Sequence, residues 1–200
     1  LPNSINELEI LADELKMTFL QVSERCKQMA EINPMLGKRG VRLGILLPEL
    51  YKMQVKAIIK ASISVYGKNQ KEFPPEIMLP MVSSFKEVNL LKKLIDDVVA
   101  EITKEFNFPI NYKLGVMVET PRAALKAGEL AVISSFLSFG TNDLTQMTYG
   151  LSRDDSGTFM RDYLEKGIFP VDPFRSLDLD GVGELLKIAS KKSRAANPSI

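Results

Sequence analysis

Three short apolar runs, each followed by a stretch with helical periodicity, constrain the fold of this chain more than any other feature. The runs are Ile77–Met81, Leu114–Val118 and Phe136–Gly140. Short apolar strands that alternate with helices are typical of a parallel sheet, so the sequence predicts an α/β fold. A fourth run, Val41–Leu47, is interrupted by Arg42 and could be a strand or a tight helix. If the Val41–Leu47 run is a strand, the expected sheet has about four parallel strands.

The spacing of apolar residues predicts the helices around these runs. Residues 4 to 30 have the pattern of one or two amphipathic helices. We expect a helix from Pro48 to about Tyr66, because proline suits the first helical position and Gly67 follows the last. A long helix is expected from about Phe85 to Phe106, and a last amphipathic one over Leu177 to Ala196.

Composition excludes several classes of function. The 26 Lys and Arg residues nearly balance 25 Asp and Glu residues, so no overall charge favours nucleic acid or an anionic membrane. The longest run without an ionisable side chain, Leu130–Asn142, has 13 residues and is too short to span a bilayer. The chain has no histidine, which excludes Ser-His triads and a phosphohistidine within it, and no P-loop sequence occurs. The single cysteine, Cys26, indicates a reducing compartment, and we expect the cytoplasm.

Two acidic residues follow neighbouring apolar runs. Glu119 comes directly after Val118, and Asp143 comes shortly after Gly140. Because the carboxyl ends of parallel strands meet at one edge of a sheet, we expect these two carboxylates to lie close together. Two carboxylates, completed by water and a substrate phosphate, suit Mg²⁺, so the sequence predicts a divalent metal site. The same residues could instead cap the helices that follow them.

Other residues could bind an anion or substrate at this edge. Gly140 would let the backbone approach a ligand closely, and the Asn142 amide could donate to a developing oxyanion. Arg39, between Gly37 and Gly40, could clamp an anion through two parallel hydrogen bonds, or it could be a surface arginine. The run Arg153-Asp154-Asp155 is interpreted as a solvated turn with its own ion pairs.

Three strings along the chain carry a resemblance to a known family. They are Asn33-Pro34-Met35-Leu36-Gly37-Lys38-Arg39-Gly40-Val41-Arg42, Val116-Met117-Val118-Glu119-Thr120-Pro121-Arg122-Ala123-Ala124, and Ser138-Phe139-Gly140-Thr141-Asn142-Asp143-Leu144-Thr145-Gln146. In this order they resemble the PEP-utilising enzyme family. The resemblance implies a PEP- and pyruvate-binding domain of the (β/α)₈ TIM-barrel family. We expect residues 1–200 to form part of one such barrel, with 1–32 as a helical insertion, 33–150 as strand–helix units, and 151–200 as a loop and terminal helix.

The resemblance also implies roles for single residues. Arg39 would grip the substrate phosphate, and Glu119 and Asp143 would ligate Mg²⁺. The residues that would bind PEP or its enolpyruvate are Arg39, Glu119, Gly140, Thr141, Asn142 and Asp143. Arg39 and Asn142 would be the catalytic groups within this chain.

Within the family, residues 152–155, 163–168 and 172–174 look most like the dikinase branch. That branch interconverts ATP, pyruvate and phosphate with AMP, PEP and pyrophosphate through a phosphohistidine on another domain, in a homodimer. The phosphoenolpyruvate synthase and enzyme I branches are alternatives, as are a fragment that only binds and a chain kept for partner contacts. The family's Gly-Ile-Cys-Gly-Glu-His-Gly-Gly stretch is absent, Cys26 lies in a different motif, and a second substrate arginine would precede Leu1. We therefore expect an internal fragment that is inactive alone and self-associates through an exposed sheet.

Overall fold

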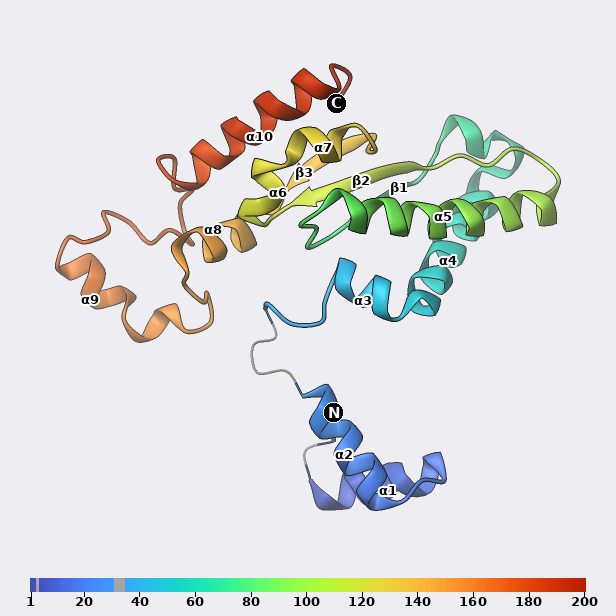
Figure 1. Ribbon diagram of the computed structural model, residues 1–200, viewed down its shortest axis with the longest axis horizontal. Helices are drawn as coiled ribbons and strands as arrows, with labels where there is room; N and C mark the ends of the chain where they lie inside the picture. The colour runs from blue at the N-terminus through green and yellow to red at the C-terminus, as the bar shows by residue number, and fades with distance from the viewer. Residues whose placement is uncertain (3, 31–34) are drawn as a thin grey trace. The chain divides into compact units, whose positions relative to one another are not determined.

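The structure is a computed structural model, and it describes residues 1–2, 4–30 and 35–200 (Figure 1). The chain divides into two compact units, Leu1–Arg39 and Gly40–Ile200, which are described separately. The expected boundary between residues 32 and 33 lies outside the described residues, as do Asn33 and Pro34 of the first family string.

The first unit contains two helices, α1 (Ile5–Leu15) and α2 (Phe19–Met29). Residues 4 to 30 therefore form two helices, in agreement with the pattern in the sequence. Each begins with a capping box, in which Ser4 or Thr18 exchanges hydrogen bonds with the third helical residue. Among the described residues of this unit, Ala12 and Val22 are the buried ones. Local capping therefore defines these helices more than a core does.

The second unit is built on a three-stranded parallel sheet in the order β1 (Glu76–Leu79), β2 (Lys113–Val118) and β3 (Phe136–Phe139). The register pairs Leu79 with Val116, and Val118 with Phe139. The α/β class and the three predicted strands are therefore confirmed. β1 ends before the predicted Met81, because Pro80 has no N–H to donate and Met81 has a φ of 58°.

The fourth predicted strand is wrong, because Val41–Leu46 forms a short helix, α3. The N–H of Gly44 donates to the carbonyl of Gly40 at 3.1 Å, as in an α-helix. A Cβ on Gly44 would lie 2.5 Å from the ring of Tyr51, so this glycine lets that ring pack against the helix. The run is apolar because it is a helix packed on the core, and the described sheet has three strands instead of about four.

Helices account for most of the remaining second unit. Their bounds are α4 (Pro48–Tyr66), η1 (Gly67–Glu72), α5 (Phe85–Phe106), α6 (Pro121–Leu125), α7 (Ala127–Ala131), α8 (Thr141–Tyr149), η2 (Ser156–Thr158), α9 (Met160–Glu165) and α10 (Val182–Ala196). α4 and α5 have the predicted bounds. α10 begins later than the predicted Leu177, because Asp178 accepts hydrogen bonds from the N–H groups of Gly181 and Val182 and so caps the helix at that point. In the described part of the chain, no helix is both long and apolar enough to cross a bilayer.

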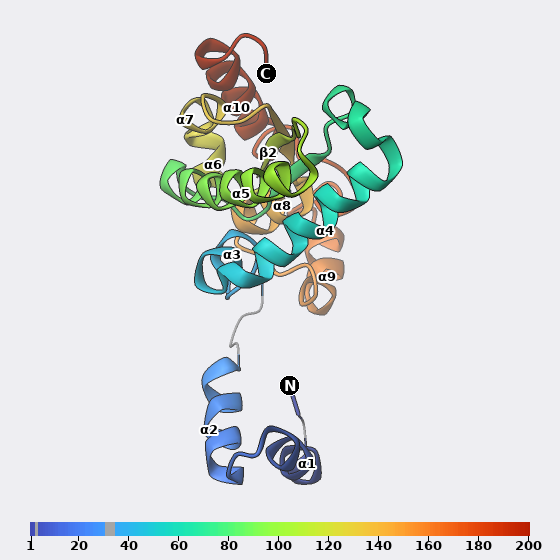
Figure 2. The same ribbon diagram turned by 90° about the vertical axis from the view of Figure 1, so that its right-hand side faces the viewer.

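The two faces of the sheet differ in how well they are covered. One face presents Ile77, Leu79, Leu114, Val116 and Val118 to a core shared with α4, α5, α6, α7 and α10. Figures 1 and 2 show α5 beside α4, and α10 beside α6 and α7, as their contacts also require. The opposite face carries side chains of the alternate register positions, among them Met78, which is 38% exposed.

Candidate functional site

Glu119 lies where the three strands end. It directly follows β2, the middle strand, and it is only 6% exposed. Its Oε1 accepts a hydrogen bond at 2.5 Å from the N–H of Met81, in the loop after β1. Its Oε2 lies against Gly140, directly after β3, since a Cβ added there would be 2.6 Å from this oxygen. The loops that follow all three strands therefore meet around one carboxylate.

The donor to Glu119 is held in an unusual backbone conformation. Met81 has a φ of 58°, in the left-handed region that residues with a Cβ rarely adopt, and it is 2% exposed. Gly40 packs against it so closely that an added Cβ would lie 2.8 Å from the Cβ of Met81. Such a conformation costs about 1–3 kcal/mol and persists where the surroundings enforce it. The turn after β1 is thus shaped to direct its N–H toward Glu119.

The alternative that Glu119 caps the next helix is wrong. Thr120 is the N-cap of α6, and its Oγ1 accepts a hydrogen bond from the N–H of Ala123 at 3.1 Å. The same hydroxyl donates to the carbonyl of Val82 at 3.0 Å, which fastens α6 to the loop after β1. Because Thr120 caps the helix, the Glu119 carboxylate lies across the strand ends instead.

Asp143 lies in the first turn of α8, whose N-cap is Gly140. It follows the exposed residues Thr141 and Asn142 and is itself half-buried. An acidic side chain in the first turn is favoured by the helix dipole, so Asp143 partly matches the capping interpretation, although it is not the N-cap itself. Its Oδ1 accepts a hydrogen bond from Nε2 of Gln146 at 3.3 Å. The structure thus brings Glu119 against the glycine from which the helix carrying Asp143 begins.

The two carboxylates fit the ligand chemistry of Mg²⁺. This ion is usually held by one or two carboxylates and keeps several waters and substrate oxygens as its other ligands. Among the described residues, no group of three or more His, Cys, Asp or Glu side chains is placed to share a metal. Glu119, directly after β2, and Asp143, in the first turn of α8, are two carboxylates of the type that Mg²⁺ accepts as ligands.

Arg39 is the last residue of the first unit, whereas Glu119 and Asp143 belong to the second. Within its own unit, its N–H donates to the carbonyl of Gly37 at 3.1 Å, and its Nη1 donates to Sδ of Met35 at 3.2 Å. Its part in the site remains a prediction from the family string.

Three contributors to the strand-end region were not foreseen from the sequence. The N–H of Met81 leaves no signal in the sequence, because every residue except proline has one. Thr120 follows the predicted acid and precedes Pro121, which is a recognisable N-cap pattern. Gln146 lies within the third family string, but only the fold reveals that it contacts both Asp143 and the N–H of Arg153.

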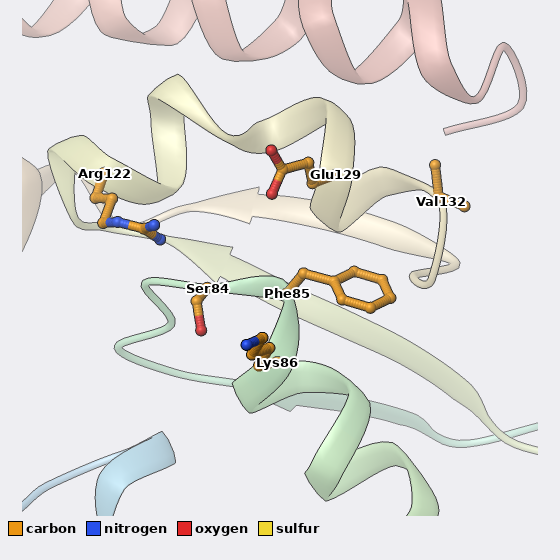
Figure 3. A pocket seen from close by; sticks show the side chains of 6 residues that line it. All are labelled: Ser84, Phe85, Lys86, Arg122, Glu129 and Val132. Atoms are coloured by element: carbon orange, nitrogen blue, oxygen red, sulfur yellow. The ribbon is translucent and has the colours of Figure 1, made fainter.

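A separate pocket lies on the helical side of the second unit (Figure 3). It is lined by Ser84, Phe85, Lys86, Arg122, Glu129 and Val132. Its lining combines the charged side chains of Lys86, Arg122 and Glu129 with the apolar groups of Phe85 and Val132. The Lys126 ammonium, hydrogen-bonded to Glu129, holds the pKa of that carboxyl below its usual value. This mixture of charges does not select an anion, so the strand ends remain the better candidate site.

Comparison with known proteins decides the family. Residues 5–197 match the model of the PEP-utilising enzymes, described as their PEP-binding domain. The chain belongs to this family. It is 44% identical over 200 residues to the pyruvate, phosphate dikinase of Rickettsia prowazekii (strain Madrid E). The matched region covers 100% of this chain and 23% of that protein. It is 49% identical over 187 residues to a chloroplastic pyruvate, phosphate dikinase of Mesembryanthemum crystallinum, covering 94% of this chain and 20% of the relative.

The family match confirms the resemblance that the three strings carry. The chain spans about a quarter or less of the length of these relatives, with 23% and 20% of each covered. The strand ends that meet at Glu119 and Gly140 belong to the second and third strings, so the region assembled by the fold coincides with the strings that carry the resemblance.

Proposed function

We propose that this chain is the PEP- and pyruvate-binding part of a pyruvate, phosphate dikinase, with Glu119 and Asp143 as ligands of Mg²⁺. The observation that carries the proposal is the buried Glu119 carboxylate at the junction of three strand ends. Burying an ionised carboxylate costs on the order of several kcal/mol unless hydrogen bonds or a cation offset this penalty. A metal bound there would use this carboxylate and explain its place in the fold.

The chemistry of the reaction suits this arrangement. Pyruvate must become its enolate before it accepts a phosphoryl group, and Mg²⁺, when bound, supplies Lewis-acid stabilisation of that negative charge. Glu119 is held for this role by the N–H of Met81, and Asp143 by its place in the first turn of α8. Gly140 contributes space, because a side chain there would collide with Glu119.

The remaining residues of the proposed site bind and orient the substrate. Arg39 grips the phosphate and neutralises its charge during transfer, where catalysis depends mainly on positioning and electrostatics. Asn142 donates from its amide to the enolate oxygen, and Thr141 contacts the substrate beside it. Both are exposed at the start of α8, which leaves them accessible to a small anion.

We further propose that the described sheet is part of a (β/α)₈ barrel. Three parallel strands in sequential order, with crossover helices on one face, are consistent with a segment of such a barrel. Residues 1–32 form a helical insertion, 33–150 the strand–helix units, and 151–200 a loop and terminal helix. The chain contains no histidine, so the phosphohistidine comes from another domain of a larger, homodimeric enzyme. The 200-residue chain alone then gives no turnover.

The proposal is tested by removing each metal ligand in the intact protein that carries this sequence. Glu119→Gln and Asp143→Asn each lower the rate of PEP formation from pyruvate about 1,000-fold or more, equivalent to about 4 kcal/mol of transition-state stabilisation. Steady-state rates are measured while Mg²⁺ is varied from limiting to saturating concentration. Glu76→Gln is the matched control, since Glu76 is an exposed acid at the opposite end of the same sheet. Near-normal PEP formation by either site variant at low Mg²⁺ would refute the metal assignment.

A further inference from the structure

Gln146 has a buried side chain whose two polar atoms are both engaged. The residue is 8% exposed. Its Oε1 accepts a hydrogen bond from the N–H of Arg153 at 2.8 Å, and its Nε2 donates to Oδ1 of Asp143 at 3.3 Å. A backbone N–H can only donate, so the amide atom that faces Arg153 must be oxygen. The NH₂ group is therefore directed toward the Asp143 carboxylate.

The partner of this amide belongs to a well-fastened loop. The N–H of Leu151 donates to the carbonyl of Gln146 at 3.0 Å, and Oγ of the buried Ser156 donates to the carbonyl of Arg153 at 2.9 Å. The interpretation of Arg153-Asp154-Asp155 as a solvated turn therefore misses its main-chain role. The loop presents one backbone N–H to Gln146 and thereby fixes the orientation of its amide.

We propose that Gln146 is a positioning residue that orients the Asp143 carboxylate for the metal ion and is itself held by the main chain of the loop at Arg153. This inference rests on the proposed function, because it assigns Gln146 to a carboxylate proposed there as a metal ligand. A donor to one carboxylate oxygen restrains the rotation of that group and leaves the other oxygen in a defined direction. Loss of such an outer partner typically weakens metal binding about 10- to 100-fold.

The chain offers a matched control for this role. Gln70 is also buried, with 0% exposure, and its amide also makes two hydrogen bonds. Its Nε2 donates to the carbonyl of Asn111 at 2.7 Å, and its Oε1 accepts from the N–H of Asn111 at 3.0 Å. Asn111 precedes β2, so this glutamine lies at the opposite end of the sheet from Glu119. Replacing either glutamine with methionine removes a similar amide from a similarly buried position.

The test measures the binding of Mn²⁺, in the presence of PEP, to the intact protein that carries this sequence. Electron paramagnetic resonance reports free Mn²⁺, so the readout is independent of turnover. Gln146→Met raises the Kd for Mn²⁺ about 10-fold or more, whereas Gln70→Met leaves it unchanged. Gln146→Asn gives the same direction of effect with less disturbance of the interior, because its shorter side chain cannot span both Arg153 and Asp143.

Asp143→Asn distinguishes the metal assignment itself from the role of Gln146. If this variant binds Mn²⁺ as tightly as the unaltered protein, the metal assignment fails, and the proposed function fails with it. If it loses Mn²⁺ binding while both Gln146 variants keep the original Kd, only the role of Gln146 is overturned. Equal weakening by Gln146→Met and Gln70→Met would also overturn it, because a general loss of stability would then explain both.

Discussion

The polar groups at the two ends of the three-stranded sheet differ in how they are buried and paired. At the amino end, the neutral amide of Gln70 is satisfied by both backbone groups of Asn111, and the charges of Glu76 and Lys113 pair at the exposed surface. At the carboxyl end, the Glu119 carboxylate is buried and held by the N–H of a residue in a left-handed conformation. The two ends of one sheet therefore meet different requirements.

The contrast lies in what each end costs the fold. A buried amide with both atoms satisfied costs little, and an exposed ion pair contributes only about 0–1 kcal/mol. The left-handed conformation of Met81, in contrast, costs the fold about 1–3 kcal/mol. Locally unfavourable choices of this kind are expected where a ligand, and not the fold alone, sets the requirement.

Of the substitutions that test this difference between the two ends, Gly140→Ala is expected to have the largest effect, a loss of rate. The new Cβ would lie 2.6 Å from Oε2 of Glu119, 2.7 Å from its Cβ and 3.0 Å from Sδ of Met117, so the carboxylate must shift. A displacement of about 1 Å in a site can cost about 100-fold in rate, and we expect PEP formation by the intact protein to fall by that factor. Gly157→Ala is the matched control, because a Cβ there meets open space and the rate should remain within about twofold. Equal rates for the two variants would contradict the close packing at Glu119.

A smaller effect, on stability alone, is expected at the amino end for Gln70→Met. This substitution leaves the N–H and carbonyl of Asn111 without their partner, and we expect the free energy of unfolding to fall by about 2 kcal/mol. Urea denaturation followed by circular dichroism measures the change, and the rate of PEP formation below the unfolding transition should not move. A loss of rate without a loss of stability would break the distinction between the two ends.

The smallest effect is a pH dependence at Tyr112, which directly precedes β2. Burial, together with the hydrogen bond from its hydroxyl to Oδ1 of Asp96 at 2.6 Å, raises the pKa of Tyr112 above the ordinary value of 10.0. The fold thus favours the neutral phenol. The stability that this preference contributes is present below pH 10 and is lost as the pH rises further.

Tyr112→Phe should therefore cost about 1 kcal/mol at neutral pH and make the unfolding free energy fall less steeply above pH 10. Urea unfolding at a series of pH values measures both quantities. Tyr66→Phe, a change at an exposed tyrosine, provides the control. An unchanged pH dependence in Tyr112→Phe would mean that the fold does not favour the neutral form of this residue.

Local signals explain why some helices were predicted at both ends. α4 begins at Pro48 and is stopped by Gly67, and α5 begins after the Ser84 capping box. α3 was ambiguous because a short apolar run is equally suited to a buried strand and to a buried helix. Its helical state depends on packing against Tyr51, which is a tertiary contact.

The site could be predicted only as far as strand ends determine it. The rule that parallel strands end at one edge predicted that Glu119 and Asp143 would lie close together, and the structure brings Glu119 against Gly140, the N-cap of the helix that carries Asp143. The backbone donor at Met81 could not be predicted, because propensities disfavour a left-handed conformation for methionine. The contact between Gln146 and the N–H of Arg153 requires the loop after α8 to return to that helix, which no pattern in the sequence indicates.

The sparse burial within the first unit has a consequence for its motions. With Ala12 and Val22 as the buried residues among those described there, α1 and α2 rely on their capping boxes and have little packing to lose when they open. Segments of this kind unfold locally at small free-energy cost, long before a central strand such as β2 does. Their amide protons should therefore exchange early, and a protease should find its first cleavage site among them.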